Sequence, residues 1–289
     1  MWELTINGID FYHIINWFFI YSFLGWVWET FYVSIKRGEL VNRGFVSGPF
    51  CTIYGFGAIF VYLILKPVEQ SLLFLFLGGI VVATLLEYIT AVLMESIFHT
   101  SWWDYSDKKF NFQGRICLGA SLGWGIFTVG LFRVLHPVVE ELVRFYPVYV
   151  GKAGVCVIAV GYLCDFCRSA SAAFHLKDRI PFWEQELEKK QVELMLKLNA
   201  RLDALELPRG VSLDSVREKI EDVEVLRTLS QKRLALQKEL AEEIGSYRKA
   251  LVAKTKGNTR RFLKAYPHLN RGYRMRHEKD KNNLQKEEK

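Results

Sequence analysis

The chain has 289 residues, of which 51% are hydrophobic and 24% charged. Residues 1–175 carry 11 Lys and Arg against 12 Asp and Glu, a net charge of −1, whereas residues 176–289 carry 27 against 19, a net charge of +8. Nearly all long apolar runs fall in the first part, which excludes a single water-soluble globule. The division predicts a membrane domain followed by a soluble helical domain.

Five apolar runs are long enough to cross a bilayer as helices, which takes about 20 residues each. They are Phe11–Ile35, Phe45–Leu65, Ser71–Phe98, Ile116–Leu135 and Val148–Phe174. The first ten residues hold two acids and no Lys or Arg, unlike a secretory signal, which begins basic. We therefore expect an all-α, polytopic membrane bundle of about five transmembrane helices over residues 1–175.

Small residues indicate how these helices pack, because membrane helices associate where backbones approach closely. Gly25 and Gly55 lie on faces lined by other small residues, and Gly119 and Gly123 form a GxxxG pattern. The five cysteines are scattered and odd in number, which does not suggest a disulfide framework. We expect them to be inert, buried thiols, including the pair at Cys164 and Cys167.

Basic residues in short loops predict the orientation of a membrane protein. The loops after the first and third runs hold Lys36, Arg37 and Arg43, and Lys108, Lys109 and Arg115, respectively. The loops on the other side hold Lys66, and Arg144 beside two glutamates. We therefore expect a cell-membrane protein with its N-terminus outside and its C-terminus in the cytoplasm.

Residues 176–256 predict a cytoplasmic, antiparallel hairpin of two amphipathic helices, similar to a coiled coil. The first helix is expected at Phe182–Glu206, Leu207–Gly210 breaks it, and Ser212 caps a second helix that ends near Lys256. The second helix is longer, so part of its apolar stripe needs another partner. Dimerisation and docking on the membrane domain are both open.

Residues 257–289 predict a basic, disordered tail. From Lys254 to Arg276 there are eight Lys and Arg and no acid, with Phe262, Tyr266 and Tyr273 between them. Contact with anionic lipid headgroups is a second interpretation. Nucleic acid is the least favoured partner.

Ionisable side chains inside a membrane are costly, so each is a functional candidate. Glu87 is the deepest, whereas Glu29 and Glu95 lie toward the cytoplasmic ends of their runs. Arg43 and Arg115 supply planar guanidinium groups, whose forked N–H donors are suited to binding a carboxylate or a phosphate. We expect these five residues to converge on one cytoplasm-facing cleft that takes an anionic ligand. The structural alternative is that each glutamate is buried against a nearby arginine.

The loops beside these charges add further candidates. The tandem tryptophans of the second loop also fit an interfacial anchor. The full set of candidate binding residues is Glu29, Asn42, Arg43, Glu87, Glu95, Trp103, Asp104, Tyr105, Asn111 and Arg115.

Known catalytic and nucleotide-binding signatures are missing from the sequence. There is no GxxxxGK[ST], HExxH or GxSxG pattern and no cluster of histidines. We therefore expect no resident metal or cofactor, and an enzyme is the less favoured class.

Several separated motifs occur in order over the first part of the chain. They are Phe23-Leu-Gly-Trp26…Glu29, Asn42-Arg-Gly-Phe45…Gly48-Pro49, Ile53-Tyr-Gly-Phe56-Gly57, Glu87-Tyr88…Met94-Glu95, Trp102-Trp-Asp-Tyr-Ser106…Asn111…Gly114-Arg115…Leu118 and Trp124-Gly125. Together they resemble the ABC-transporter type IV (CmpB-like) permease family, found mainly in Gram-positive bacteria of the clostridial type. The resemblance covers about Asn16 to Arg168. The sequence departs from the family pattern at Phe50-Cys51, because family members often have a proline near that point.

This resemblance implies a transport component in a bacterial cell membrane, powered by a separate ATP-binding subunit. Because five short spans make a small domain, we expect at least two copies, such as a homodimer, to form a translocation path. It implies no particular substrate and no site residues. The alternative is a membrane-embedded enzyme, or a protein that binds anionic lipid headgroups, with a polar cleft at the cytoplasmic face. Transport predicts polar residues through the whole depth of the bundle, whereas the alternative predicts them on the cytoplasmic side only.

Overall fold

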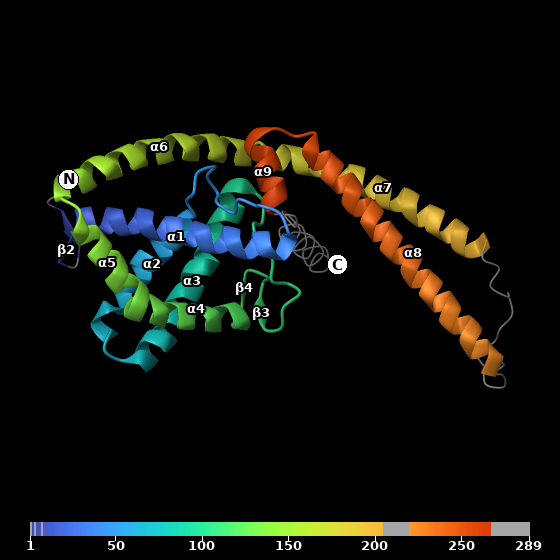
Figure 1. The fold of residues 1–289 in the computed structure, drawn as a ribbon, viewed down its shortest axis with the longest axis horizontal. Helices are drawn as coiled ribbons and strands as arrows, with labels where there is room; N and C mark the ends of the chain where they lie inside the picture. Colours follow the sequence, from blue (N-terminus) through green and yellow to red (C-terminus); the bar gives the residue numbers. More distant parts are fainter. Residues whose placement is uncertain (1, 3, 7, 205–219, 267–289) are drawn as a thin grey trace, which may run out of the picture. The chain divides into compact units, whose positions relative to one another are not determined.

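A computed structural model describes residues 2, 4–6, 8–204 and 220–266 (Figure 1). The chain divides into two compact units. One unit holds Met1–Lys177 together with the segment that begins at Gly257, and the other is Asp178–Lys256. The first is the membrane unit and the second is the hairpin unit.

The membrane unit is built almost entirely from helices, which confirms the all-α membrane bundle. Its two small antiparallel hairpins pair Thr5 with Asp10 and Asn111 with Cys117. In chain order its elements are β1 Thr5–Ile6, β2 Ile9–Asp10, α1 Phe11–Arg37, α2 Thr52–Leu65, a 3₁₀ turn Lys66–Val68, α3 Leu72–Phe98, β3 Asn111–Phe112, β4 Ile116–Cys117, α4 Leu118–Gly130, a π-helical turn Leu131–Leu135, α5 His136–Phe145, α6 Val148–Phe174 and α9 Gly257–Ala265.

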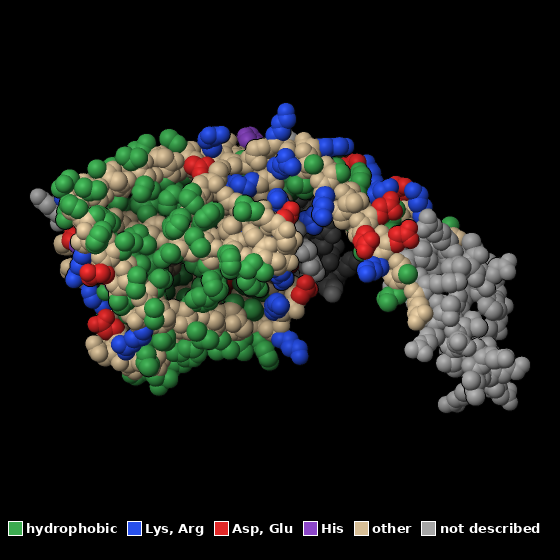
Figure 2. Space-filling model, in the orientation of Figure 1, with side chains coloured by type: hydrophobic (Ala, Val, Ile, Leu, Met, Phe, Trp, Pro, Cys, Tyr) green, Lys and Arg blue, Asp and Glu red, His purple; other side chains and the backbone are tan. Residues whose placement is uncertain are grey.

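Among the described residues, four helical segments are long and apolar enough to cross a membrane. They are Phe11–Arg37, Leu72–Phe98, Leu118–Phe145 and Val148–Phe174. Many of their apolar side chains point outward, including Phe31 at 65% exposure, and hydrophobic side chains cover much of the visible face of this unit (Figure 2). Lipid is the natural solvent for such a surface. The chain is therefore a multi-pass membrane protein.

The second expected span differs from the prediction, because only its later part is helical. Helix α2 has 14 residues, which is about 21 Å of helix. The preceding residues 38–51 form an irregular segment, which we call the re-entrant loop. It leaves α1 at Gly38, whose φ is 65°, and returns alongside α1 until the Cys51 amide donates to the Ser22 carbonyl at 2.8 Å.

Part of the re-entrant loop is buried against other protein segments. Val41 is 1% exposed and Val46 is 0% exposed, and the Gly48 amide donates to Asp165 of α6 at 2.7 Å. Irregular backbone at membrane depth is tolerated only where other protein groups satisfy it or water reaches it. The loop therefore depends on its neighbours for its hydrogen bonds.

Small residues let the helices pack closely, in part as expected. A Cβ added to Gly25 would overlap Tyr54 of α2, and one added to Gly79 of α3 would overlap Thr128 of α4. By contrast, a Cβ at Gly119 or Gly123 would meet nothing within 4 Å among the described residues. The GxxxG pattern is therefore not a packing face within the described part of this chain.

The expected burial of the cysteines is correct for two positions and wrong for three. Cys51 and Cys117 are buried, whereas Cys156, Cys164 and Cys167 are exposed. These three lie on α6, whose apolar face is itself exposed, so a thiol there needs no protein cover.

The hairpin unit contains most of α7, Leu176–Ala204, and α8, Ile220–Ala253. Tyr247 donates to Glu186 at 3.5 Å, and Lys190 lies 3.9 Å from Glu243. The partner numbers rise on one helix as they fall on the other, so the two helices run antiparallel. The expected break at Leu207–Gly210 and the expected cap at Ser212 lie outside the described residues.

Helix α9 differs from the expected disordered tail. Gly257–Ala265 is helical, and Phe262 and Ala265 are 0% exposed. Phe262 and Tyr266 are four residues apart and so share one face, which gives this basic segment an apolar side to bury. The expectation of disorder is wrong for residues 257–266, and residues 267–289 lie outside the described part.

Candidate functional site

The bundle has two ends, which we name by the segments found there. The loop end carries the re-entrant loop, the connection 99–115 and α9. The opposite end carries β1, β2, the α2–α3 turn and the α5–α6 junction. All ten candidate residues lie at the loop end or project from it into the bundle.

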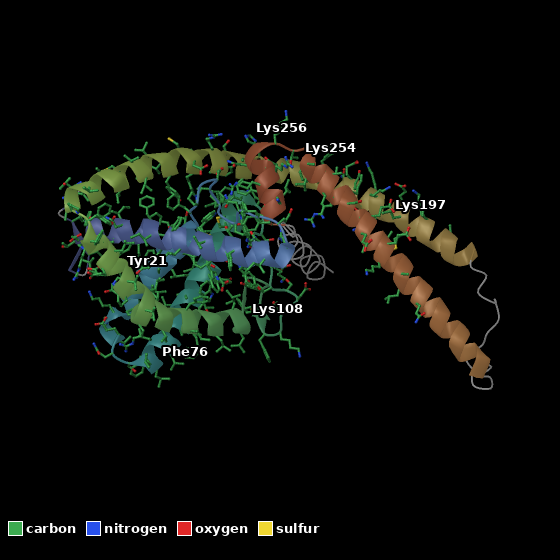
Figure 3. The ribbon with its side chains drawn as sticks, in the orientation of Figure 1. Tyr21, Phe76, Lys108, Lys197, Lys254 and Lys256 are labelled. Atoms are coloured by element: carbon green, nitrogen blue, oxygen red, sulfur yellow. The ribbon has the colours of Figure 1, made fainter. Side chains whose placement is uncertain are left out.

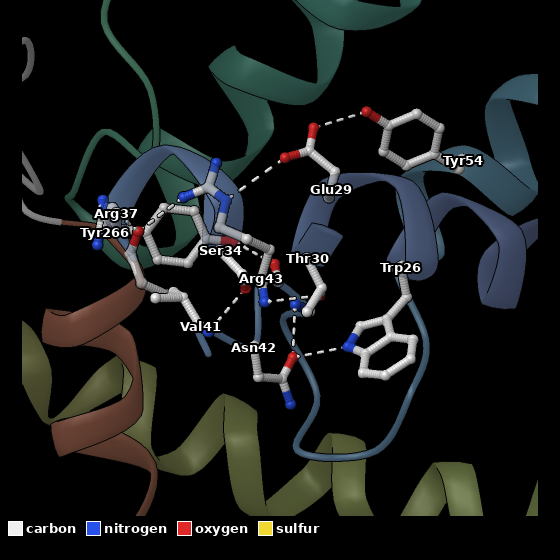
Figure 4. A network of polar contacts seen from close by, with 12 residues as sticks. Trp26, Glu29, Thr30, Ser34, Arg37, Val41, Asn42, Arg43, Tyr54 and Tyr266 are labelled. Atoms are coloured by element: carbon white, nitrogen blue, oxygen red, sulfur yellow. Dashed lines mark hydrogen bonds and ion pairs between the residues drawn. The ribbon is translucent and has the colours of Figure 1, made fainter. Parts of the chain in front are cut away.

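Glu29 of α1 is the centre of the first network (Figure 4). Tyr54 of α2 donates to its Oε1 at 2.6 Å, and Arg43 Nε lies 3.4 Å from its Oε2. Asn42 accepts a hydrogen bond from Trp26 Nε1 at 2.9 Å. The structure thus brings Glu29, Asn42 and Arg43 together.

Arg43 is also engaged by α9. Its Nη1 donates to the Ala265 carbonyl at 2.8 Å, and its guanidinium lies 4.3 Å from the centre of the Tyr266 ring. Burial raises the pKa of Tyr266 to about 12, so the phenol keeps its proton at neutral pH and donates to the Arg43 carbonyl at 2.8 Å. The fork of Arg43 caps a helix C-terminus, where cations are stabilising, and is not free to hold a ligand.

Glu95 and Arg115 form the second network. Arg115 donates to Glu95 Oε2 from Nη2 at 2.7 Å and from Nε at 3.0 Å. Glu95 is 7% exposed, and Trp103 Nε1 donates to the Arg115 carbonyl at 2.9 Å. Trp103 therefore fixes the backbone that carries the arginine.

Glu87 is the centre of the third network, on the same helix as Glu95 but deeper. It is 7% exposed. Tyr105 lies 3.1 Å from its Oε1, and Trp124 Nε1 donates to its Oε2 at 3.0 Å. Burial, followed by the nearby Glu87 carboxylate, raises the pKa of the Tyr105 phenol. Within the described residues Glu87 forms no ion pair, unlike Glu29 and Glu95.

Asp104 and Asn111 shape their own loop and do not reach the bundle interior. Asp104 accepts from the amide and hydroxyl of Ser106 at 3.0 and 2.6 Å. Asn111 donates to the Lys108 carbonyl at 2.8 Å and accepts from the Gly114 amide at 3.0 Å. Short polar side chains of this kind stabilise turns, so these two candidates have a local structural explanation.

The networks of Glu29 and Glu87 are neighbours, because the rings of Tyr54 and Trp124 lie 6.3 Å apart. The expected convergence on an anion-binding cleft meets one difficulty, which is that both arginines are already bonded to protein groups. Pairing with arginine, the structural alternative, describes Glu29 and Glu95. Ligand binding by the ten residues stays a prediction.

A further polar cluster lies at the opposite end, and sequence reasoning missed it. His13 contacts Asp10 at 2.8 Å, and Trp17 Nε1 donates to Glu140 at 3.1 Å. Beside them Tyr21, labelled in Figure 3, lies 2.7 Å from Nδ1 of His136. The histidines are more than a hundred residues apart, so no local spacing marks this cluster. Only the tertiary fold assembles it.

Several residues that contact the candidate glutamates or the re-entrant loop were also missed. Tyr54 and Trp124 stand within the motifs that carry the family resemblance, and those motifs were the available signal for them. Arg261 and Tyr266 stand in the basic segment, where their charge and ring gave no hint of a buried position. Among the residues described, no group of three His, Cys, Asp or Glu could hold a metal ion.

Comparison with known proteins gives one result. A family profile described as "Putative ABC-transporter type IV" matches residues 16–170, just over half of the chain. Neither the curated proteins nor the solved structures give a match. The matched segment contains the re-entrant loop and all three glutamate networks. The chain belongs to this family of proteins related to ABC transporters.

Proposed function

We propose that this chain is the membrane-spanning, permease-type subunit of an ABC-type transporter. Its family is related to ABC transporters, and the described helices form a multi-pass bundle. The sequence has no GxxxxGK[ST] pattern, so the nucleotide would bind a separate ATP-binding subunit. Two copies of the chain would complete a translocation pathway.

The polar interior carries this proposal, because it extends along the whole bundle. The His13 and His136 clusters lie at one end, and the Glu29 and Glu87 networks lie toward the other. Between the ends, Thr52 lies 2.8 Å from the Tyr162 hydroxyl. Polar side chains inside a membrane bundle are expensive, and they mark the pathways of ions and substrates.

The alternative, a headgroup-binding protein or enzyme at the cytoplasmic face, has less support. It requires arginine forks that can take a phosphate. Arg43 is bonded to Glu29 and to α9, and Arg115 is bonded to Glu95. The polar cluster at the opposite end also has no role in that interpretation.

Helix α9 supplies a route from the hairpin to the interior. Its side chains donate to four carbonyls of the re-entrant loop, those of Leu40, Arg43, Gly44 and Phe45. The same loop holds the Arg43 that pairs with Glu29. Because Lys256 directly precedes α9 in the chain, a partner that pulls on the hairpin acts on the loop. We infer that the hairpin, pairing as a coiled coil, is where the ATP-binding subunit acts.

The nucleotide-binding partner gives the first test. We expect the full-length chain, purified from its native membrane after mild cross-linking, to bring with it a second chain that azido-ATP labels. Deleting residues 178–256 and joining the ends by a flexible linker should remove that labelled chain. A complex in which azido-ATP labels this chain itself, or labels nothing, would contradict the proposal.

Orientation gives the second test. We propose that the loop end faces the cytoplasm. Lys109 and Gln70 are exposed at opposite ends of the bundle, and Lys108 beside Lys109 projects from the loop end (Figure 3). In intact cells an impermeant maleimide should label Gln70→Cys and spare Lys109→Cys, with the parent chain giving the background. The reverse pattern would invert the topology.

A further inference from the structure

Three of the candidate residues are glutamates of the membrane unit, and one of them differs from the other two in its partners. Glu29 and Glu95 each contact an arginine, at 3.4 and 2.7 Å. Glu87 is as buried as Glu95, each at 7% exposure, yet within the described residues it has no cationic partner. An unpaired buried charge costs far more than a paired one, so Glu87 needs another means of neutralisation.

The two oxygens of Glu87 have contacts that fit a neutral carboxylic acid. Trp124 Nε1 can only donate, so Oε2 must accept, as the carbonyl oxygen of an acid does. Tyr105 donates to Oε1 in the structure, but a phenol can also accept, so a protonated Oε1 can donate to the phenol oxygen instead. A neutral Glu87 therefore keeps both hydrogen bonds without any movement.

The tyrosine contacts of the two glutamates also differ in length. The Tyr54 hydroxyl lies 2.6 Å from Glu29, which is within the range of about 2.5–2.7 Å for a bond from a hydroxyl to an ionised carboxylate. The Tyr105 hydroxyl lies 3.1 Å from Glu87. The shorter bond belongs to the glutamate that is paired with arginine, and the longer bond belongs to the one that is not.

The ionisable groups around Glu87 do not replace the arginine that Glu29 and Glu95 each have. Glu29 lies beyond the Tyr54 and Trp124 rings, and Cys117 lies close to Tyr105. Glu95 and Arg115 neutralise each other about two turns along α3. The nearest ionisable groups are therefore acids, a phenol, a thiol and an already compensated ion pair. None of them places an uncompensated positive charge beside Glu87, although the Tyr105 and Trp124 hydrogen bonds can be made to either form of the carboxyl.

We propose that Glu87 is a proton-binding site, with a neutral carboxyl inside the resting bundle, whereas the carboxyls of Glu29 and Glu95 are each paired with an arginine. This reverses the expected charge of the ligand, because the interior then has a carboxyl to offer to a cation, whereas Arg43 and Arg115, the two arginines expected to bind an anion, are bonded to protein groups. Tyr105, which is only partly buried on the loop that covers this end, gives the proton a route to water. The inference adds a ligand class to the proposed transport role.

Infrared spectroscopy of the full-length chain in lipid vesicles tests this inference. A protonated carboxyl has a carbonyl band above the amide region, and a carboxylate does not. We expect the wild-type spectrum to contain such a band and the Glu87→Gln spectrum to lack it. The band should decline by about tenfold for each pH unit above the pKa of the group. Glu29→Gln is the matched control and should keep the band.

A second variant keeps the acid and changes only its hydrogen bond. Trp124→Phe removes the donor to the carbonyl oxygen and should move the same band to higher frequency. The proposal would be overturned if the wild-type and Glu87→Gln spectra agree between about pH 5 and pH 8, the range in which carboxyls with raised pKa values titrate. It would also be overturned if Trp124→Phe leaves the frequency of the band unchanged. Neither measurement uses transport, so the proton site and the proposed function fail separately.

Discussion

Replacing Arg261 by alanine is expected to detach α9 from the re-entrant loop. Arg261 donates to the Gly44 and Phe45 carbonyls and, at 3.3 Å, to the Ser169 hydroxyl. Burial lowers the pKa of its guanidinium, but Arg261 is still charged at neutral pH. Hydrogen bonds from a charged donor contribute about 1.5–3 kcal/mol each, and buried carbonyls left without a donor add their desolvation cost. We expect a loss of about 3 kcal/mol or more in the free energy of unfolding of the membrane unit.

The neighbouring residue provides the control for this experiment. Arg260 has the same charge and lies on the same helix but is exposed, so Arg260→Ala should change stability by no more than about 0.5 kcal/mol. Thermal unfolding in detergent measures both variants, and protease cleavage before Gly257 reports whether α9 has been released. Equal behaviour of the two variants would show that the α9 contacts do not hold the loop.

Removing the Glu95 carboxylate is expected to have a comparable effect. Glu95→Gln leaves Arg115, 18% exposed, beside a neutral amide. Breaking a buried ion pair by removing one partner costs about 3–5 kcal/mol, because the remaining charge stays buried. The surface variant Arg144→Gln also removes one ion-pair partner, but Arg144 is 67% exposed. It should lose less than about 1 kcal/mol.

A double variant separates the pair from its individual residues. Glu95→Gln with Arg115→Met removes both charges and should recover most of the stability that Glu95→Gln loses, since no unpaired charge remains. Thermal unfolding of the two single variants and the double variant gives the coupling energy. Effects that simply add would mean that the two residues act independently, which the 2.7 Å contact does not predict.

The membrane bundle could be predicted from the sequence because hydrophobic length is a strong and local signal. The runs at Ser71–Phe98 and Val148–Phe174 correspond closely to α3 and α6. The run at Phe45–Leu65 does not correspond to a whole helix, because its first residues satisfy their backbone groups through distant side chains such as Asp165 and Arg261. Composition alone cannot distinguish a buried irregular segment from a helix.

The candidate site was predictable in its charges and not in its partners. Glu29, Glu87 and Glu95 are rare ionisable residues in apolar runs, so each was visible. Their different neutralisation was not visible, since Arg43 and Arg115 stand at similar positions in their loops. Helix α9 was interpreted as a tail because its charge density is high and its apolar face consists of little more than Phe262 and Tyr266.

The return of the chain to the membrane unit at α9 has a consequence for biosynthesis. Arg261 reaches the carbonyl of Gly44 across 217 residues of sequence. At a synthesis rate of about 5–20 residues per second, the re-entrant loop would wait roughly 10–40 s for its last hydrogen-bond donors. Until then Arg43, which pairs with Glu29, lies on a loop that lacks its hydrogen bonds from α9. The membrane bundle therefore stays incomplete after its last long helix has been made, and synthesis of the hairpin delays the moment at which α9 can complete it.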